Sequence, residues 1–145
     1  MKKVCIITAA RSEYGLLRWT IDGVEHNPRL ALQLVVTGAH LMSCHGNTYK
    51  CIEDDGYPIS AKVDMGLDSG SKQSIVESMG RCGLGFAKTF AELQPDIVVV
   101  LGDRYELLPI CSAALLMNIP IAHISGGDVT IGAIDNEVRN AVTMM

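Results

Sequence analysis

The chain has 145 residues, of which 48% are hydrophobic and 19% charged, and its formal net charge is −4. This balance fits a single globular domain, and an acidic chain without a basic run argues against nucleic acid or an anionic membrane as a partner. Each apolar run is shorter than the roughly 18 residues that a membrane span needs. Five irregularly spaced cysteines without a Cys-x-x-Cys pair predict neither a disulfide framework nor a zinc site, so we expect a cytoplasmic protein.

Short apolar runs alternate with helical patterns along the whole chain. We expect strands at 3–9, 30–37, 59–65, 96–101 and 119–124. A turn is expected at 11–15, with a helix after it to about 26, and further helices are expected at 47–54 and 71–93, from about 105, and from 136 onward. This alternation predicts an α/β fold with a doubly wound, Rossmann-like parallel sheet. The dinucleotide fingerprint Gly-x-Gly-x-x-Gly and the P-loop motif are both absent from the sequence.

Three glycines interrupt the helical pattern over 71–93, and polar residues fill the loop expected at 66–71. Gly80, Gly83 and Gly85 each cost a helix up to about 1 kcal/mol relative to alanine. Such a cost indicates close packing of the helix or the close approach of a ligand.

Polar residues follow the carboxyl ends of the expected strands, which is the edge where open parallel sheets bind ligands. Arg11 comes directly after the first strand and before a helix N-terminus, a place that favours a phosphate group. The alternative is a solvated arginine that pairs with Glu13. The residue pattern leaves both interpretations open.

The sequence Gly-Asp-Arg at 102–104 places two opposite charges where a buried strand ends. Asp103 suits acid–base chemistry, and Arg104 suits a phosphate. The alternative for Asp103 is that it caps a helix that starts near Tyr105.

A second polar turn, Ser125-Gly126-Gly127-Asp128, follows the last strand, and its glycines would allow a backbone to approach a ligand closely. An ordinary strand-to-loop turn explains it equally well. Asp135 is expected to return to the same edge of the sheet.

Three of the four histidines receive different interpretations. We expect His40 to be exposed at the ligand edge, whereas His123 is expected to be a core histidine with its hydrogen bonds satisfied. His45 and Cys44 have no further ligands nearby in the sequence, so we predict no metal site.

Several of these segments resemble the hydrolysing UDP-N-acetylglucosamine 2-epimerases. The matching segments are Arg-Ser-Glu-Tyr-Gly-Leu-Leu-Arg-Trp at 11–19, Thr-Gly-Ala-His-Leu at 37–41, His-Gly-Asn-Thr at 45–48, Gly-Asp-Arg-Tyr-Glu at 102–106 and Asn-Ile-Pro-Ile-Ala-His-Ile-Ser-Gly-Gly-Asp-Val-Thr-x-Gly-Ala-Ile-Asp at 118–135. The similarity spans the chain in order. It implies a GT-B-type fold of two Rossmann-like domains, of which residues 1–145 would be the N-terminal one.

The resemblance implies a function in the biosynthesis of sialic-acid-type sugars. It implies elimination of UDP from a UDP-sugar to give a glycal, followed by addition of water to give the 2-epimeric free sugar, with no metal or nicotinamide cofactor. It assigns catalysis to Asp103, Asp128 and Asp135, and substrate binding to Arg11, Gly15, His40, Arg104, Ser125, Gly126 and Gly127. It further implies a homo-oligomer when the protein is complete.

Two positions depart from the family pattern. Ser125 stands where family members have His or Glu, and Asp128 stands where many have Glu. These changes would reshape the sugar pocket and admit a modified substrate such as UDP-diacetylbacillosamine.

The chain ends at Met144-Met145 inside a helical pattern without a stop signal, so we expect a C-terminal nucleotide-binding domain to be missing and the fragment to be inactive. Two alternatives to an epimerase remain, half of a GT-B glycosyltransferase or a non-catalytic module that binds nucleotide sugars.

Overall fold

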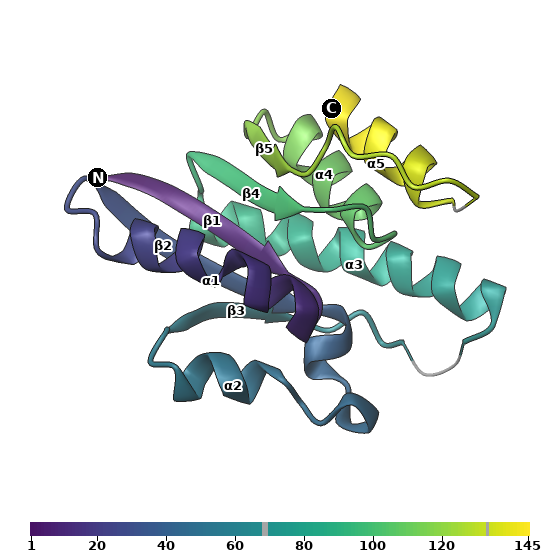
Figure 1. Cartoon of the computed structure of the whole chain (residues 1–145), viewed down its shortest axis with the longest axis horizontal. Helices are drawn as coiled ribbons and strands as arrows, with labels where there is room; N and C mark the ends of the chain where they lie inside the picture. Colours follow the sequence, from purple (N-terminus) through teal and green to yellow (C-terminus); the bar gives the residue numbers. More distant parts are fainter. Residues whose placement is uncertain (68–69, 133) are drawn as a thin grey trace.

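A computed structural model describes residues 1–67, 70–132 and 134–145 and shows a five-stranded sheet with helices on both faces (Figure 1). All strand pairs are parallel, and the strand order is β3-β2-β1-β4-β5. The strands are β1 (Lys2–Thr8), β2 (Leu30–Thr37), β3 (Ile59–Val63), β4 (Ile97–Leu101) and β5 (Ile121–Ile124). The predicted doubly wound α/β sheet is confirmed, with strand ends that lie within two residues of those expected.

In the part of the chain that the structure describes, four α-helices and two 3₁₀ turns lie between the strands, and a fifth α-helix follows β5. They are α1 (Arg11–Glu25), η1 (Gly38–Leu41), η2 (Ser43–His45), α2 (Tyr49–Asp54), α3 (Lys72–Leu93), α4 (Leu107–Leu116) and α5 (Asp135–Met144). Among the described residues, none of these helices combines the length and the apolar character that crossing a membrane requires. Asp68 and Ser69 of the expected loop, and Ala133 of the 118–135 segment, lie outside the described residues.

The sheet separates two hydrophobic cores because successive side chains of a strand point to opposite faces. Val4 and Ile6 of β1 pack in the core beneath α1 and α2, whereas Cys5 and Ile7 pack in the core beneath α3, α4 and α5. Strands buried on both faces explain the continuous apolar runs in the sequence.

The three glycines of α3 differ in how closely neighbouring atoms approach them. A Cβ atom on Gly85 would lie 2.5 Å from Cγ1 of Val63 in β3, so this glycine allows the helix to lie close to the sheet. A Cβ on Gly83 would make ordinary contact with Pro109, and one on Gly80 would meet no atom of the described residues within 4 Å. Close packing therefore accounts for Gly85, and the alternative of a ligand has no support at the other two positions.

The order of the strands places β1 and β4 side by side at the centre of the sheet (Figure 1). From β1 the chain proceeds to β2 on one side, and β4 later begins the other side. This reversal creates a crevice outside the carboxyl ends of β1 and β4, which is the usual ligand position in doubly wound sheets. Arg11 and Arg104 follow these two strands.

Candidate functional site

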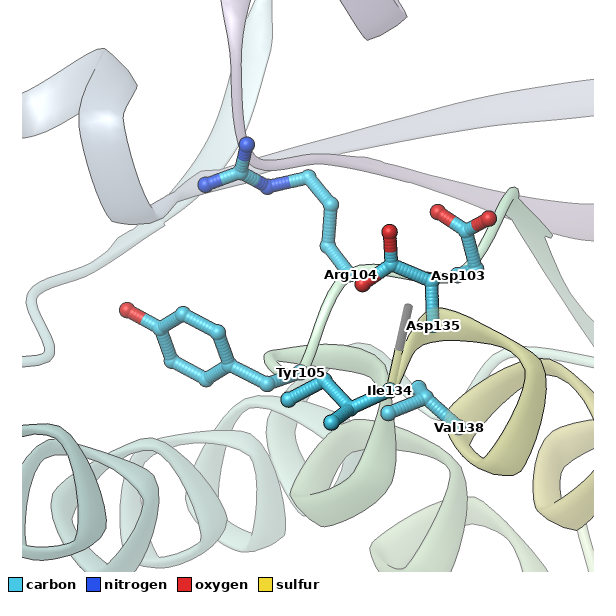
Figure 2. A pocket seen from close by; sticks show the side chains of 6 residues that line it. All are labelled: Asp103, Arg104, Tyr105, Ile134, Asp135 and Val138. Atoms are coloured by element: carbon cyan, nitrogen blue, oxygen red, sulfur yellow. The ribbon is translucent and has the colours of Figure 1, made fainter. Parts of the chain in front are cut away.

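Two acidic residues from distant parts of the chain line one pocket at the carboxyl edge of the sheet. This acid-pair pocket has a volume of about 320 Å³ and is lined by Asp103, Arg104, Tyr105, Ile134, Asp135 and Val138. Asp103 follows β4, and Asp135 begins α5. Figure 2 shows the two carboxylates on the same side of the pocket, opposite the apolar side chains of Ile134 and Val138. The structure thus brings together the two predicted acids at 103 and 135.

Asp103 is held by Arg139, a side chain of α5 that sequence analysis did not single out. Nη2 of Arg139 donates to Oδ2 of Asp103, and Arg139 is only 3% exposed. Nη1 of the same guanidinium donates to the carbonyl oxygen of Asp128 (2.6 Å) and to Oδ1 of Asn136 (2.9 Å). The capping alternative for Asp103 is wrong, because α4 begins at Leu107 and has no side-chain cap.

A second pocket opens at the reversal of strand order, and we call it the switch-point pocket. Its volume is about 420 Å³, and it is lined by Ala10, Arg11, Ser12, Ala39, His45, Thr48 and Arg104. Arg104 therefore borders both pockets. Arg11 is exposed at the N-terminus of α1, where the helix dipole and free N–H groups favour an anion.

The expected alternative for Arg11, a pair with Glu13, is not found. Among the described residues Arg11 has no ion pair or side-chain hydrogen bond, and Glu13 instead turns inward. Glu13 Oε2 accepts a 2.7 Å hydrogen bond from the N–H of Ala9, and the side chain is buried. Burial raises the pKa of the Glu13 carboxyl, while the Ala9 N–H and the Arg104 guanidinium oppose the rise.

Arg104 is paired with two carboxylates that lie beneath it. Its Nη2 lies 2.8 Å from Oε1 of Glu106, and its Nε lies 3.7 Å from Oε1 of Glu13. The Arg104 side chain is still 40% exposed, and it borders both pockets. The positive charge of Arg104 is thus partly balanced by Glu106 and Glu13, whereas Arg11 has no such carboxylate partner among the described residues.

His40 is completely buried, which corrects the expectation of an exposed histidine at the ligand edge. Its Nε2 lies 3.0 Å from the Thr8 hydroxyl, and its Nδ1 lies 2.8 Å from the Thr48 hydroxyl. Because Thr8 Oγ1 donates to the carbonyl of Ala10, it accepts from Nε2–H, which leaves Nδ1 to accept from Thr48. Burial lowers the pKa of His40 to about 4, so the ring is neutral at pH 7. The reason for its burial is that Gly38 begins a 3₁₀ turn that folds back over the end of β1.

In the turn after β5, Gly126 allows close packing against neighbouring side chains and does not leave open space for a ligand. Ser125 has a positive φ of 63°, and a Cβ on Gly126 would lie 2.8 Å from both His123 Nδ1 and Thr143 Oγ1. His123 is partly buried and has both ring nitrogens in hydrogen bonds, to Thr143 Oγ1 (2.9 Å) and to the carbonyl of Gly102 (2.6 Å), as expected for a satisfied histidine. Gly127 and Asp128 are exposed.

Gly15 lies apart from the acid pair, on α1. It lines a pocket of about 540 Å³ between α1 and α2, which also contains Arg11, Trp19 and Asp55. Arg11 borders this pocket and the switch-point pocket, so the three pockets form a series joined by Arg11 and Arg104. Among the described residues no group of three or more His, Cys, Asp or Glu side chains could hold a metal ion.

Four residues of the site escaped sequence analysis as functional candidates, namely Glu13, Thr48, Glu106 and Arg139. Glu13 and Glu106 each lie two residues after an arginine of the ligand edge, and this spacing was a usable signal. Arg139 follows Asp135 by four residues and lies beside the buried Val138 and Val142 on the inner face of α5. A charged residue on an otherwise apolar helix face was the signal there.

Comparison with known proteins gives matches over most of the chain. Residues 22–145 match the family model described as UDP-N-acetylglucosamine 2-epimerase. A GDP/UDP-N,N'-diacetylbacillosamine 2-epimerase (hydrolyzing) from Campylobacter jejuni is 42% identical over 144 residues, which cover 99% of this chain and 37% of the relative. The polysialic acid biosynthesis protein P7 of Escherichia coli is 38% identical, with 100% of this chain and 37% of the relative covered.

Solved structures agree with this result at the level of the fold. The UDP-GlcNAc 2-epimerase of Neisseria meningitidis, solved with UDP-GlcNAc bound, has a TM-score of 0.80 and 18% sequence identity. The alignment covers 99% of this chain and 38% of that one, which makes the present fold one half of a GT-B-type architecture. The chain thus spans little more than a third of the length of the proteins it matches.

Proposed function

The chain belongs to the UDP-N-acetylglucosamine 2-epimerase family, and on this premise we propose that it is the N-terminal part of a hydrolysing UDP-sugar 2-epimerase. A second Rossmann-like domain, which binds most of the nucleotide, would complete the cleft in the longer protein. The relatives that are nearly three times as long support this organisation. The isolated chain, with only one wall of the cleft, would be inactive.

The observation that carries the proposal is the acid-pair pocket. Asp103 and Asp135 are 32 positions apart in the sequence but line one pocket, and Arg104 lies beside both. Two carboxylates beside one sugar ring suit a reaction that removes a proton from C2 and later returns one to it. Asp128 is the third proposed acid, and Arg139 ties its backbone to Asp103.

In the proposed reaction one carboxylate removes the proton from C2 of the sugar, and the electron pair forms the C1–C2 double bond as the C1–oxygen bond to UDP breaks. Water then adds to the glycal, with the hydroxyl group at C1 and a proton at C2 on the opposite face. The products are UDP and the 2-epimeric free sugar. Arg11, Arg104 and the N-terminus of α1 would stabilise the negative charge that develops on the diphosphate.

The remaining assigned residues have indirect or peripheral positions in this proposal. His40 would act through Thr48, whose hydroxyl group lines the switch-point pocket. Ser125, Gly126 and Gly127 would shape the wall that carries Asp128, and Gly15 would border the nucleotide on the α1 side. No metal or nicotinamide is proposed.

For the substrate we propose UDP-N-acetylglucosamine or its modified relative UDP-diacetylbacillosamine. The Campylobacter relative, whose name includes the second sugar, is 42% identical to this chain. The polysialic acid biosynthesis relative supports a place in the synthesis of sialic-acid-type sugars. We also propose a homo-oligomer, which the family resemblance implies, and a cytoplasmic location, which the five free cysteines support.

The test is to incubate the full-length protein separately with each of the two UDP-sugars and to measure UDP release and the configuration of the free sugar. The proposal predicts stoichiometric UDP and 2-epimeric sugar from at least one of them. Sugar transfer to an added acceptor alcohol with no free 2-epimer would indicate a glycosyltransferase instead. Binding of UDP without any turnover would indicate a non-catalytic module.

A further inference from the structure

The two buried carboxylates beneath Arg104 suggest a function beyond charge balance. We infer that Glu106, assisted by Glu13, is a positioning residue that holds the Arg104 guanidinium at the switch-point pocket and keeps it away from the acid pair Asp103–Asp135. This inference rests on the proposed function, because it assigns one task to the arginine and another to the acids. Glu106 itself is not expected to touch the substrate.

Glu106 is built into the fold as a fixed anchor. It is 1% exposed, and a single oxygen, Oε1, accepts from both Nη2 (2.8 Å) and Nε (3.3 Å) of Arg104. Gly38, in the left-handed region with a φ of 57°, lets the end of β2 come close, and a Cβ there would lie 3.2 Å from the same oxygen. The carboxylate also lies at the N-terminus of α4, where the helix dipole favours a negative charge.

Glu13 contacts the guanidinium from the side of β1. Its Oε1 lies 3.7 Å from Nε of Arg104, and its Oε2 is fixed by the N–H of Ala9. Among the described residues, Oε1 of Glu13 and Oε2 of Glu106 are buried without a hydrogen-bond partner. An unpartnered buried oxygen is costly, and the attraction of each carboxylate to Arg104, made through Oε1 in both residues, opposes that cost.

Asp103 and Asp135 are the carboxylates that would compete with Glu106 and Glu13 for the Arg104 guanidinium. Arg104 directly follows Asp103 in the sequence and borders the same pocket as Asp135, yet Figure 2 shows its guanidinium turned away from both carboxylates. Among the described residues, the charged and titratable groups that line the acid-pair pocket or bind its acids are Arg104, Tyr105 and Arg139. An arginine that is freed from Glu106 would be drawn to the acid pair, and an added positive charge lowers the pKa of a carboxyl and weakens it as a base.

The test uses the full-length protein and the variants Glu106→Gln, Arg104→Ala and the double variant. The pH dependence of kcat/KM for UDP release should shift by about one unit toward lower pH on its acidic limb in Glu106→Gln. UDP binding should weaken by about tenfold in the same variant, because the guanidinium no longer faces the switch-point pocket. Glu106→Asp, which keeps the charge but shortens the side chain, should show the same changes to a smaller degree.

The double variant separates positioning from a merely structural effect. If Glu106 acts through Arg104, the pH shift must vanish in the Arg104→Ala background, because no guanidinium is left to move. The matched control is Glu53→Gln. Glu53 is a half-exposed glutamate on α2 that pairs with Lys62 of β3, and its substitution should leave both the pH dependence and the UDP affinity unchanged.

An unchanged acidic limb and UDP affinity within twofold of the wild type, for both Glu106 variants, would contradict the inference. An equal shift with and without Arg104 would contradict it too. Such results with an active wild type leave the proposed function intact, whereas a wild type that neither binds nor releases UDP would overturn the proposed function and this inference together.

Discussion

His40 shows how a single residue links the strand ends to the pocket wall. Its neutral ring joins Thr8 at the end of β1 to Thr48 before α2, and Thr48 lines the switch-point pocket. Protonation of the ring would remove the acceptor for the Thr48 hydroxyl. The loop that carries this wall of the pocket therefore depends on an uncharged histidine.

We predict that this histidine makes the fold sensitive to mild acid. The pKa of His40 is about 4 in the folded chain and about 6.5 when unfolded, so the unfolded state binds the proton more readily between these values. The stability that His40 contributes is therefore fully present above about pH 6.5 and is lost as the pH falls toward 4. The urea midpoint should fall more between pH 7 and pH 5 in the wild type than in His40→Gln.

The comparison isolates His40, because Glu13, another buried group with a shifted pKa, is present in both proteins. The effect of Glu13 on stability also has the opposite sign. Burial raises the pKa of Glu13, so its proton uptake favours the folded state as the pH falls. Equal falls of the midpoint in the wild type and in His40→Gln would rule out His40 as the acid-sensitive group.

Arg11 offers a second prediction at the scale of one residue. It is the guanidinium at the edge of the switch-point pocket that has no ion-pair partner among the described residues, so its full charge is available to a diphosphate. Each charge-assisted hydrogen bond contributes roughly 1.5–3 kcal/mol, so Arg11→Ala should weaken UDP binding by about ten- to a hundredfold. Arg11→Lys should restore only part of it, because lysine lacks the bidentate fork.

Calorimetric titration of the full-length protein with UDP is the measurement for Arg11. The matched control is Arg29→Ala, an exposed arginine directly before β2 at the opposite edge of the sheet, which should bind UDP as the wild type does. Wild-type affinity in Arg11→Ala would mean that the phosphates bind elsewhere in the complete protein.

Some of these residue roles could be predicted from the sequence, and others could not. The positions of Asp103, Arg104 and Arg11 at strand ends were evident, because the apolar strands stop abruptly at charged residues. The burial of His40 and Glu13 was not evident, because it results from the 3₁₀ turn at Gly38 and from the inward turn of the first residues of α1. Arg139 could not be assigned to Asp103, because their contact joins residues 36 positions apart.

At the scale of the elements, α3 demonstrates how close packing overrides local preference. Gly85 faces Val63, a stiff β-branched side chain that is buried in β3, whereas Gly80 is exposed with open space around it. Both glycines lie in the same helix and carry the same cost in helix propensity. They therefore form a natural pair for comparison.

We predict opposite effects of alanine at these two positions. Gly85→Ala should lower the free energy of unfolding by about 1–3 kcal/mol, because its Cβ overlaps Cγ1 of Val63. Gly80→Ala should raise the same free energy by up to about 1 kcal/mol. Urea unfolding of both variants is the measurement, and in the Val63→Ala background Gly85→Ala should lose its additional cost. A destabilising Gly80→Ala would show that α3 is limited by something other than packing against β3.

The strands and helices themselves followed well from the sequence. Their patterns differ in period and their ends carry Pro, Gly and charged residues, so most of the expected bounds lie close to those observed. The exception is α1, which begins at Arg11 where a turn over 11–15 was expected, because the backbone is already helical directly after Ala10. The start of α4 shifted from about 105 to Leu107, because Arg104, Tyr105 and Glu106 form a turn that aims the arginine at Glu106. Such turns depend on tertiary partners that periodicity does not reveal.

At the scale of the whole molecule, the site exists because of the strand order. β1 and β4 are neighbours in the sheet although about 90 residues separate them, so Arg11 and Arg104 border one pocket. The alternating pattern predicted the parallel sheet, and the general rule for doubly wound folds predicted its ligand edge. The chain spans just over a third of its relatives, so the cleft as a whole belongs to the longer protein that we propose.

The central claim is that Asp103 takes part in proton transfer at C2 of a UDP-sugar. Its most direct test is incorporation of deuterium at C2 when the full-length protein turns over its UDP-sugar in D2O. We predict deuterium in the wild-type product and a loss of at least a hundredfold in its rate of formation in Asp103→Asn, with UDP binding and the thermal transition retained. The exposed Asp64→Asn, which keeps the oxygen that accepts from Gly66, should match the wild type. A wild-type product without deuterium, or an Asp103→Asn variant that forms it within tenfold of the wild-type rate, would contradict the claim.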